Sequence, residues 1–199
     1  GAAMNRLPLS LIAHLAGGEL HGEDVTVAAV SNDTRALRPG SLYVALRGER
    51  FDGHDFIAQA AAQGAGALLV DHAVDSALPQ VVVADTQQAL ARLAAGLQRD
   101  RAGKVVAITG SNGKTSVKAL VLSILERAGQ TWSTPGNRNN EIGLPLAVIE
   151  APDAAEYAVY EMGAGKPGDI AYLTDIARPD VSLVNNIAPA HLERMGSLL

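Results

Sequence analysis

A glycine-rich octapeptide at residues 109–116, Thr-Gly-Ser-Asn-Gly-Lys-Thr-Ser, constrains this chain more than any other segment. An apolar stretch at 105–109 leads into it, and an amphipathic stretch at 115–128 follows. These periodicities predict a strand before the turn and a helix after it. The N-terminus of a helix offers unpaired backbone N–H groups and a partial positive charge, which suit phosphate. The octapeptide therefore indicates a phosphate-binding loop in an α/β protein.

The residue types in the octapeptide match the chemistry of bound Mg-ATP. Gly110 lets the backbone approach phosphate oxygens closely, Lys114 reaches the β- and γ-phosphates, and the Thr115 hydroxyl ligates Mg²⁺. The spacing departs from the usual motif, because Ile108 stands where the first glycine belongs. A strand–turn–helix with an incidental Gly-Lys-Thr is the alternative. The residues predicted to bind ATP are Gly110, Ser111, Asn112, Gly113, Lys114, Thr115 and Ser116.

Glu161 and His191 are candidates for further metal ligands. Magnesium on a triphosphate takes additional ligands at the carboxyl ends of neighbouring strands. Glu161 ends the apolar stretch 157–161, although a solvated glutamate at a strand end is the alternative. His191 follows the apolar stretch 181–184, and by itself it is an ordinary loop histidine.

Strand and helix patterns fall into two blocks, with the boundary between Ala84 and Lys104. The expected fold class is α/β, with a small mixed α/β domain at 5–84 and a P-loop domain at 85–199. Alternation of strands and helices in the second block predicts a parallel sheet. Strands are expected at 25–27, 41–46, 67–70, 80–83, 105–109, 157–161 and 181–184, and helices at 9–15, 55–63, 85–99, 115–128 and 168–177.

Composition excludes several classes of protein. The formal net charge is −5, only 4% of residues are aromatic, and no Lys/Arg-rich run is present, which argues against a nucleic-acid partner. The absence of cysteine excludes disulfides, thiolate catalysis and Cys-ligated zinc. No apolar stretch reaches the roughly 20 residues that a membrane helix needs. The expected location is therefore the cytoplasm.

The motifs resemble those of the Mur ligases. A P-loop without its first glycine is typical of that family and of the related folylpolyglutamate synthases. The segment 136–145 resembles the family signature G-N-x-N-N-x-I-G-x-P, and 161–164 with 168–171 resembles E-x-G-A…G-[DE]-I-A. Further similar segments are 178–180, 185–187 and 190–193 in the second block, and 31–35, 39–46 and 51–56 in the first.

The resemblance implies an ATP- and Mg²⁺-dependent ligase of peptidoglycan precursor synthesis. It is closest to the branch that joins D-alanyl-D-alanine to UDP-N-acetylmuramoyl-tripeptide through an acyl phosphate, as a monomer. It implies catalytic roles for Lys114, Glu161 and His191. Thr115 and Glu161 would hold the nucleotide-bound Mg²⁺, and His191 would help to hold a second ion. A branch that adds a single amino acid, and a nucleotide-binding module without ligase chemistry, are the alternatives.

Substrate contacts are implied in both blocks. In the first, which resembles a UDP-binding domain, Asp33, Thr34 and Arg35 are expected to help hold the UDP-sugar. A helix cap with a surface ion pair is an equal alternative for these residues. In the second block, Asn137 and Asn140 are expected to hydrogen-bond phosphate or substrate, and a purely turn-forming role is the alternative.

The resemblance also implies parts that this sequence lacks. Family members are longer and have three domains, including a C-terminal domain that helps to bind the dipeptide. Their second metal is supported by a carbamylated lysine beyond the His191 segment, and no lysine follows His191 here. We expect a truncated piece of an enzyme, inactive by itself.

Overall fold

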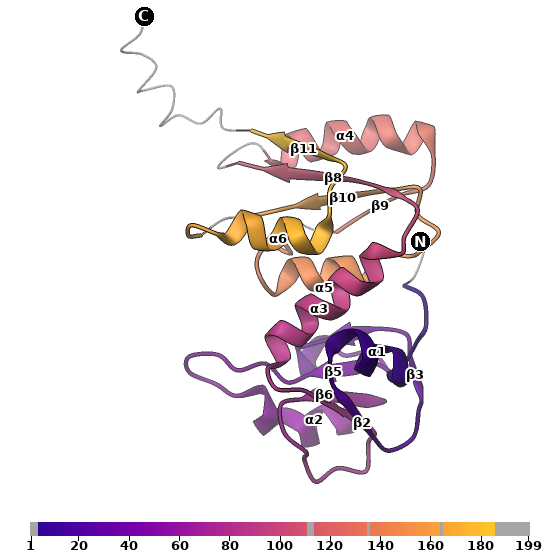
Figure 1. Ribbon diagram of the computed structural model, residues 1–199, viewed down its shortest axis with the longest axis vertical. Helices are drawn as coiled ribbons and strands as arrows, with labels where there is room; N and C mark the ends of the chain where they lie inside the picture. The colour runs from indigo at the N-terminus through magenta and orange to yellow at the C-terminus, as the bar shows by residue number, and fades with distance from the viewer. Residues whose placement is uncertain (1–3, 111–113, 135, 164, 186–199) are drawn as a thin grey trace, which may run out of the picture. The chain divides into compact units, whose positions relative to one another are not determined.

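The computed structural model describes residues 4–110, 114–134, 136–163 and 165–185 (Figure 1). The chain forms two compact units, Gly1–Leu97 and Gln98–Leu199. The start of the second domain at residue 85 stays a prediction. Within the described residues, no helix combines the length and apolar content that a membrane span requires.

The first unit is built on a five-stranded sheet in the order β2-β7-β6-β5-β4. All its pairings are parallel except that of β2 with β7. Every residue of β6 is buried, as expected for a central parallel strand covered on both faces. The strands are β2 (Glu19–His21), β4 (Val30–Ser31), β5 (Leu42–Val44), β6 (Ala67–Val70) and β7 (Gln80–Val82); β1 (Leu7–Pro8) and β3 (Thr26–Val27) form a separate antiparallel pair.

Helices complete the first unit. The expected early helix is α1 (Leu9–Ala16), which ends at Gly17 in the left-handed conformation (φ 72°). The helix predicted after residue 85 is α3 (Thr86–Arg99), where the Gln88 N–H donates to Asp85 Oδ1 at 3.0 Å. The remaining helices are the 3₁₀ helices η1 (Thr34–Ala36) and η2 (Gly53–Phe56) and the α-helix α2 (Ile57–Ala62).

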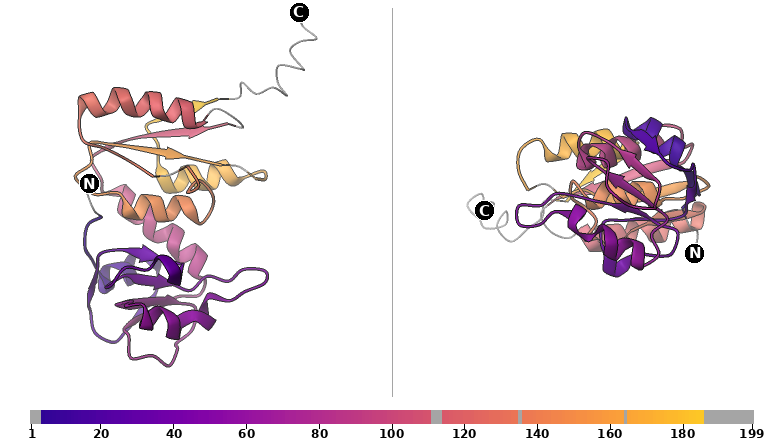
Figure 2. Two further views of the ribbon diagram at one scale, coloured as in Figure 1. Left: turned by 180° about the vertical axis from the view of Figure 1, so that it is seen from behind. Right: turned by 90° about the horizontal axis from the view of Figure 1, so that it is seen from below.

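The second unit contains the predicted parallel sheet, in the strand order β11-β8-β10-β9. Its strands are β8 (Lys104–Thr109), β9 (Thr131–Ser133), β10 (Tyr157–Glu161) and β11 (Val181–Val184). Helix α4 (Lys114–Ala128) lies on one face of this sheet, and α5 (Gly143–Glu150) and α6 (Asp169–Ala177) lie on the other (Figures 1 and 2). Because all the strands are parallel, their carboxyl ends meet at one edge, where a ligand site is expected.

The sequence analysis did not anticipate α5. Six of its eight residues are buried, so the segment has no polar face to produce a helical period. It also contains Pro145, which discourages a helix prediction. Pro145 lies in the first turn, where backbone N–H groups have no partner within the helix, so the proline costs little there.

Candidate nucleotide-binding site

The backbone at Gly110 admits no side chain. Strand β8 ends at Thr109, and Gly110 follows with φ +130°. A Cβ at this position would lie 1.9 Å from the backbone oxygen of Asn185, which follows the neighbouring strand β11. The Asn185 N–H donates to the Thr109 carbonyl at 2.9 Å, so that backbone is held in place. Gly110 is therefore required for the chain to turn out of the sheet here.

Helix α4 begins directly after this turn, at Lys114. Lys114, Thr115 and Ser116 thus form its first turn, and the helix begins one residue before the predicted start at 115. Ser111, Asn112 and Gly113 lie outside the described residues, and their expected phosphate contacts stay predictions. The arrangement of strand, glycine turn and helix N-terminus is that of a phosphate-binding loop.

An open hollow of about 540 Å³ adjoins the octapeptide. Its volume is in the range that is typical of ligand-binding sites. It lies where loops after β8 and β10 and before α5 meet, at the carboxyl edge of the sheet. Three residues expected at the site line it: Gly110, Lys114 and Asn140. The full lining is Gly110, Lys114, Asn139, Asn140, Glu141, Gly163, Gly165, Lys166 and Asp169.

The loop before α5 is held by Asn140 and Asn139. Asn140 Oδ1 accepts from the Gly143 N–H at 2.7 Å and from the Ile142 N–H at 3.1 Å. The side-chain oxygen of Asn140 therefore has the turn-forming role that was considered as the alternative. The Asn139 carbonyl accepts from the Gly163 N–H at 2.7 Å and joins this loop to the one after β10. Asn137 is exposed and does not line the hollow.

Lys166 and Asp169 were not singled out from the sequence; Asp169 lies in the quoted segment 168–171, and Lys166 lies between the two quoted segments. Asp169 Oδ2 accepts from the backbone N–H groups of Gly165 and Lys166, each at 2.9 Å. These bonds fix the loop that carries Lys166, which lines the hollow. The signal available in the sequence was the Gly-Lys-Pro-Gly-Asp string itself, which is rich in turn formers.

Glu161 is buried rather than solvated, which corrects the alternative of a solvated strand-end glutamate. Only 5% of the residue is exposed, and its Oε2 has no hydrogen-bond partner among the residues described. Lys118 Nζ, from α4, lies 3.7 Å from that oxygen. Glu161 pairs in register with Ile108 of β8, next to the octapeptide. A buried carboxylate oxygen at this edge that accepts no hydrogen bond fits a ligand for Mg²⁺.

Neither of the other two expected metal ligands is tested by the structure. Thr115 is exposed and lies on the first turn of α4, and its contact with Mg²⁺ stays a prediction. His191 lies outside the described residues, so its expected metal role stays a prediction.

A second hollow, of about 370 Å³, lies in the first unit and brings Asp33, Thr34 and Arg35 together. Asp33 Oδ1 accepts from the Arg35 backbone N–H at 2.9 Å, and Oδ2 accepts from Arg35 Nη2 at 3.0 Å. The cap and ion pair considered as an alternative are therefore present. The hydrogen bonds from Arg35 hold the pKa of the Asp33 carboxyl below its usual value. A role for these residues with the UDP-sugar stays a prediction.

Aromatic side chains also line this second hollow. They are Tyr43, Phe51 and Phe56, and the two phenylalanines are exposed. The sequence analysis quoted their segments without assigning them a role. Flat apolar rings at a hollow suit a planar ligand group.

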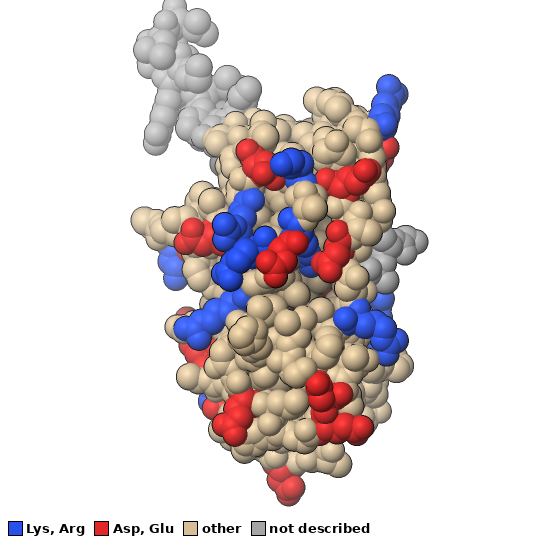
Figure 3. Space-filling view, turned by 45° about the vertical axis from the view of Figure 1, so that its right-hand side comes forward, with Lys and Arg blue, Asp and Glu red and all other residues tan. Residues whose placement is uncertain are grey.

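Charge is not gathered into a continuous basic area on the face shown in Figure 3, where Lys and Arg lie among Asp and Glu.

A parallel sheet with a glycine turn and helix at its carboxyl edge, joined to a second α/β unit, defines a P-loop nucleotide-binding protein. The chain belongs to the Mur ligase family. The family's middle domain matches residues 108–199, and a model described as the Mur ligase family catalytic domain matches residues 26–98.

Individual relatives agree with this assignment. The chain is 50% identical to UDP-N-acetylmuramoyl-tripeptide–D-alanyl-D-alanine ligase from Escherichia coli strain K12, over 98% of this chain and 43% of the relative. It superposes on a crystal structure of MurF from Acinetobacter baumannii with a TM-score of 0.88 at 36% identity, covering 98% of this chain and 44% of that one. The chain thus spans less than half the length of these relatives.

A third relative is the MurF ligase from Thermotoga maritima, whose crystal structure is a complex with ADP. The TM-score is 0.71 and the identity 40%, with 84% of this chain and 39% of that chain covered.

Proposed function

We propose that this chain provides the ATP-binding and UDP-substrate-binding parts of a ligase that joins D-alanyl-D-alanine to UDP-N-acetylmuramoyl-tripeptide. The observation that carries the proposal is the 50% identity to such a ligase over nearly the whole chain. It is supported by the hollow at the octapeptide, which presents Lys114 and the start of α4 at the carboxyl edge of the sheet. The proposed location is the cytoplasm, and the proposed state is a monomer.

The reaction we propose has two steps. The terminal carboxylate of the tripeptide attacks the γ-phosphorus of ATP, which forms an acyl phosphate and releases ADP. The amine of D-alanyl-D-alanine then attacks the acyl carbon, which forms the amide and releases inorganic phosphate. Both steps depend on alignment and charge neutralisation rather than on a protein nucleophile.

The residues of this chain have distinct roles in that scheme. Lys114 contacts the β- and γ-phosphates and stabilises negative charge as it develops. Thr115 and Glu161 hold the nucleotide-bound Mg²⁺, which neutralises phosphate charge when bound. Asn140 and Lys166 border the same hollow, and we assign them contacts with phosphate or substrate.

The test is the variant Lys114→Ala in the protein that contains this chain. Phosphate release coupled to ligation should fall by at least about a hundredfold. Lys104→Ala is the matched control, because Lys104 is exposed at the amino end of β8, away from the strand's carboxyl edge. Both variants should keep the circular dichroism spectrum of the wild type. Near-normal ligation by Lys114→Ala would contradict the proposal.

The identity of the acceptor needs a separate experiment. UDP-linked peptides should be offered with D-alanyl-D-alanine or with single amino acids as the amine. Ligation of the dipeptide supports the proposal, and exclusive ligation of a single amino acid would replace it with the other branch of the family.

A further inference from the structure

Phe51, which lines the second hollow, belongs to a short hairpin at residues 47–52. Arg47 and Asp52 pair across the base of this hairpin as an isolated antiparallel bridge. The Gly48 N–H donates to the Phe51 carbonyl at 2.9 Å, and a side chain at Gly48 would collide with the Phe51 ring. The ring therefore packs on the backbone of its own hairpin, yet Phe51 is 56% exposed. Its place at the hollow depends on how the hairpin is held.

Arg47 connects the hairpin to the sheet of the first unit. Its Nη1 donates to Asp52 Oδ2 at 2.9 Å, within the hairpin. Its Nε and Nη2 donate to the two oxygens of Asp71, which directly follows β6. All three guanidinium nitrogens are engaged, in a forked geometry that a lysine ammonium group cannot reproduce. Hydrogen bonds from Arg47 hold the pKa of the Asp71 carboxyl well below its usual value, so this carboxylate stays charged at neutral pH.

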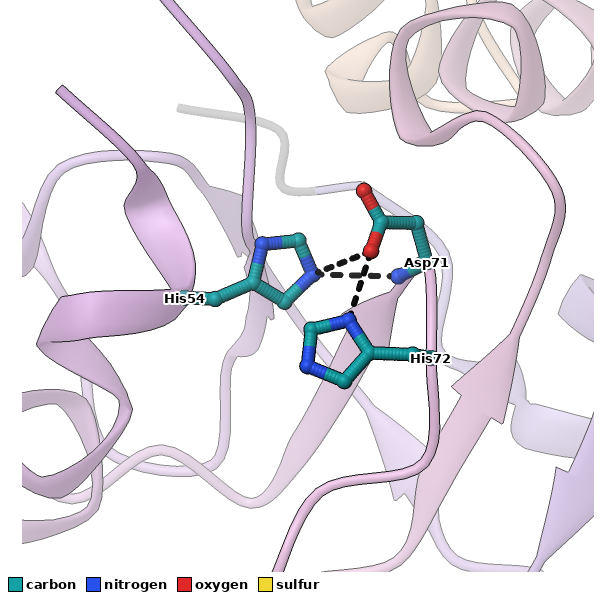
Figure 4. Close-up of side chains that lie close together, drawn as sticks. All are labelled: His54, Asp71 and His72. Carbon is teal, nitrogen blue, oxygen red and sulfur yellow. Dashed lines mark hydrogen bonds and ion pairs between the residues drawn. The ribbon is translucent and has the colours of Figure 1, made fainter.

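His54 fixes both carboxylates that Arg47 contacts. Its backbone N–H donates to Asp52 Oδ1 at 2.9 Å, and its Nδ1 lies 2.7 Å from the same oxygen. At the other side of the ring, Nε2 accepts from the Asp71 backbone N–H at 3.1 Å (Figure 4). The side chains of His54 and Asp71 are buried, at 5% and 13% exposure. The acceptors of the Arg47 guanidinium are therefore held in fixed positions.

The rest of the hairpin has no comparable contact with the sheet. The side chains of Glu49 and Arg50 are exposed and form no hydrogen bond or ion pair with any residue that the structure describes. At the base of the hairpin, the Gly53 N–H donates to the Leu46 carbonyl at 2.7 Å. Without the Arg47 contacts, residues 48–51 would be held only through this base.

We propose that Arg47 is a positioning residue for the UDP-substrate, because it holds the Phe51 ring at the second hollow. The inference rests on the proposed function, in which the first unit binds that substrate. Arg47 does not line the hollow, whereas Phe51 and Phe56 do, and their rings suit a planar group of the substrate. An aromatic side chain that is ordered before binding lowers the entropy cost of forming the complex. Arg47 thus acts on the substrate through Phe51.

Hydrogen exchange tests the structural step without a ligand. In the protein that contains this chain, Arg47→Gln should speed exchange of the Gly48 N–H by about fivefold or more and leave β6 unchanged. The Arg47 side chain is 55% exposed, so the variant should fold normally. Arg50→Gln is the matched control, because it removes the same charge from the same hairpin. Equal exchange rates in Arg47→Gln and the wild type would overturn the proposal.

Ligation kinetics test the link to the substrate. Arg47→Gln should raise the KM for UDP-N-acetylmuramoyl-tripeptide by about threefold to tenfold, with kcat and the KM for ATP near their wild-type values. A loss of folded protein would instead lower the apparent kcat and leave the KM unchanged. Arg50→Gln should behave as the wild type does. An unchanged KM in Arg47→Gln, or an equal rise in Arg50→Gln, would overturn the role of Arg47 and leave the proposed function intact.

A double-variant cycle tests whether Arg47 acts through Phe51. Phe51→Ala alone should raise the same KM by about fivefold or more. Arg47→Gln should add less than about twofold in that background, because the ring that Arg47 positions is then absent. Fully additive effects would overturn the proposal. Failure of the wild type to ligate UDP-linked peptides would overturn the proposed function, and this inference with it.

Discussion

Lys118 Nζ lies 3.7 Å from Glu161 Oε2, and both side chains are shielded from solvent, at 12% and 5% exposure. Lys118 comes from α4 and also donates to the Thr134 carbonyl, so three segments of the second unit meet at its ammonium group. Burial of a carboxylate is costly, and a neighbouring cation offsets part of that cost. The pair therefore allows the carboxyl group to stay buried beside the octapeptide.

Replacement of Lys118 should destabilise the second unit. Lys118→Met keeps most of the length of the side chain but leaves Glu161 without its cation, so the free energy of unfolding should fall by about 3 kcal/mol. Urea denaturation measures the change. The double variant with Glu161→Gln should recover much of it, because the buried charge is then removed as well. Equal stability of Lys118→Met and the wild type would show that the pair contributes nothing.

Any side chain at position 110 should disturb the octapeptide. Gly110→Ala combines a positive φ with a Cβ 1.9 Å from the Asn185 oxygen, so the unfolding free energy should fall by more than about 2 kcal/mol. ATP binding should weaken with it. Gly40→Ala is the control: its φ is +77°, but no atom lies within 4 Å of the added Cβ. The control should lose only roughly 1 kcal/mol. Similar losses in both variants would refute the argument from close contact.

Lys166→Ala should weaken nucleotide binding without affecting stability. Lys166 lines the hollow, and its backbone N–H makes the bond to Asp169, which the substitution retains. Because the residue is exposed, the expected effect is modest, about threefold to fivefold in the dissociation constant of an ATP analogue. The difference from the wild type should shrink as salt is added. Lys104→Ala should bind as the wild type does, and an unchanged constant for Lys166→Ala would exclude a phosphate contact.

Tyr43 should make the first unit sensitive to alkaline pH. Burial raises the pKa of its hydroxyl to about 12, above the ordinary value of 10.0. The stability contributed by the neutral phenol is therefore complete below pH 10 and is lost as the pH rises toward 12. In Tyr43→Phe this part of the pH dependence should disappear. The variant also loses the hydrogen bond from the hydroxyl to the Gly53 carbonyl, at a cost of about 1 kcal/mol.

Urea denaturation of both proteins between pH 9 and pH 12 separates these two effects. The wild type should lose stability faster than Tyr43→Phe over that range. Parallel curves would mean that the Tyr43 phenol titrates alike in the folded and unfolded states.

Local patterns were sufficient for much of the fold. The apolar runs of β6 and β10 and the strand–turn–helix around Gly110 are short-range features, so the sequence predicts them directly. The predictions of a mixed α/β first unit and of a parallel sheet in the second unit, which rest on the same local patterns, were confirmed. The short strands β1, β2, β4 and β9 and the buried helix α5 have weak or ambiguous periodicity, and the sequence did not predict them.

The sequence alone determined the family, because the order and spacing of several motif segments carry the resemblance. It also located the phosphate-binding loop, because the order of glycine, lysine and threonine fixes what that backbone can hold. Tertiary structure decided which distant groups meet it. The burial of Glu161, its contact with Lys118, and the approach of Lys166 and Asp169 depend on where the carboxyl ends of parallel strands converge. The same holds for Asp71 and His54, which chain spacing does not bring together. Long-range packing, rather than local propensity, sets the distances at each of these places.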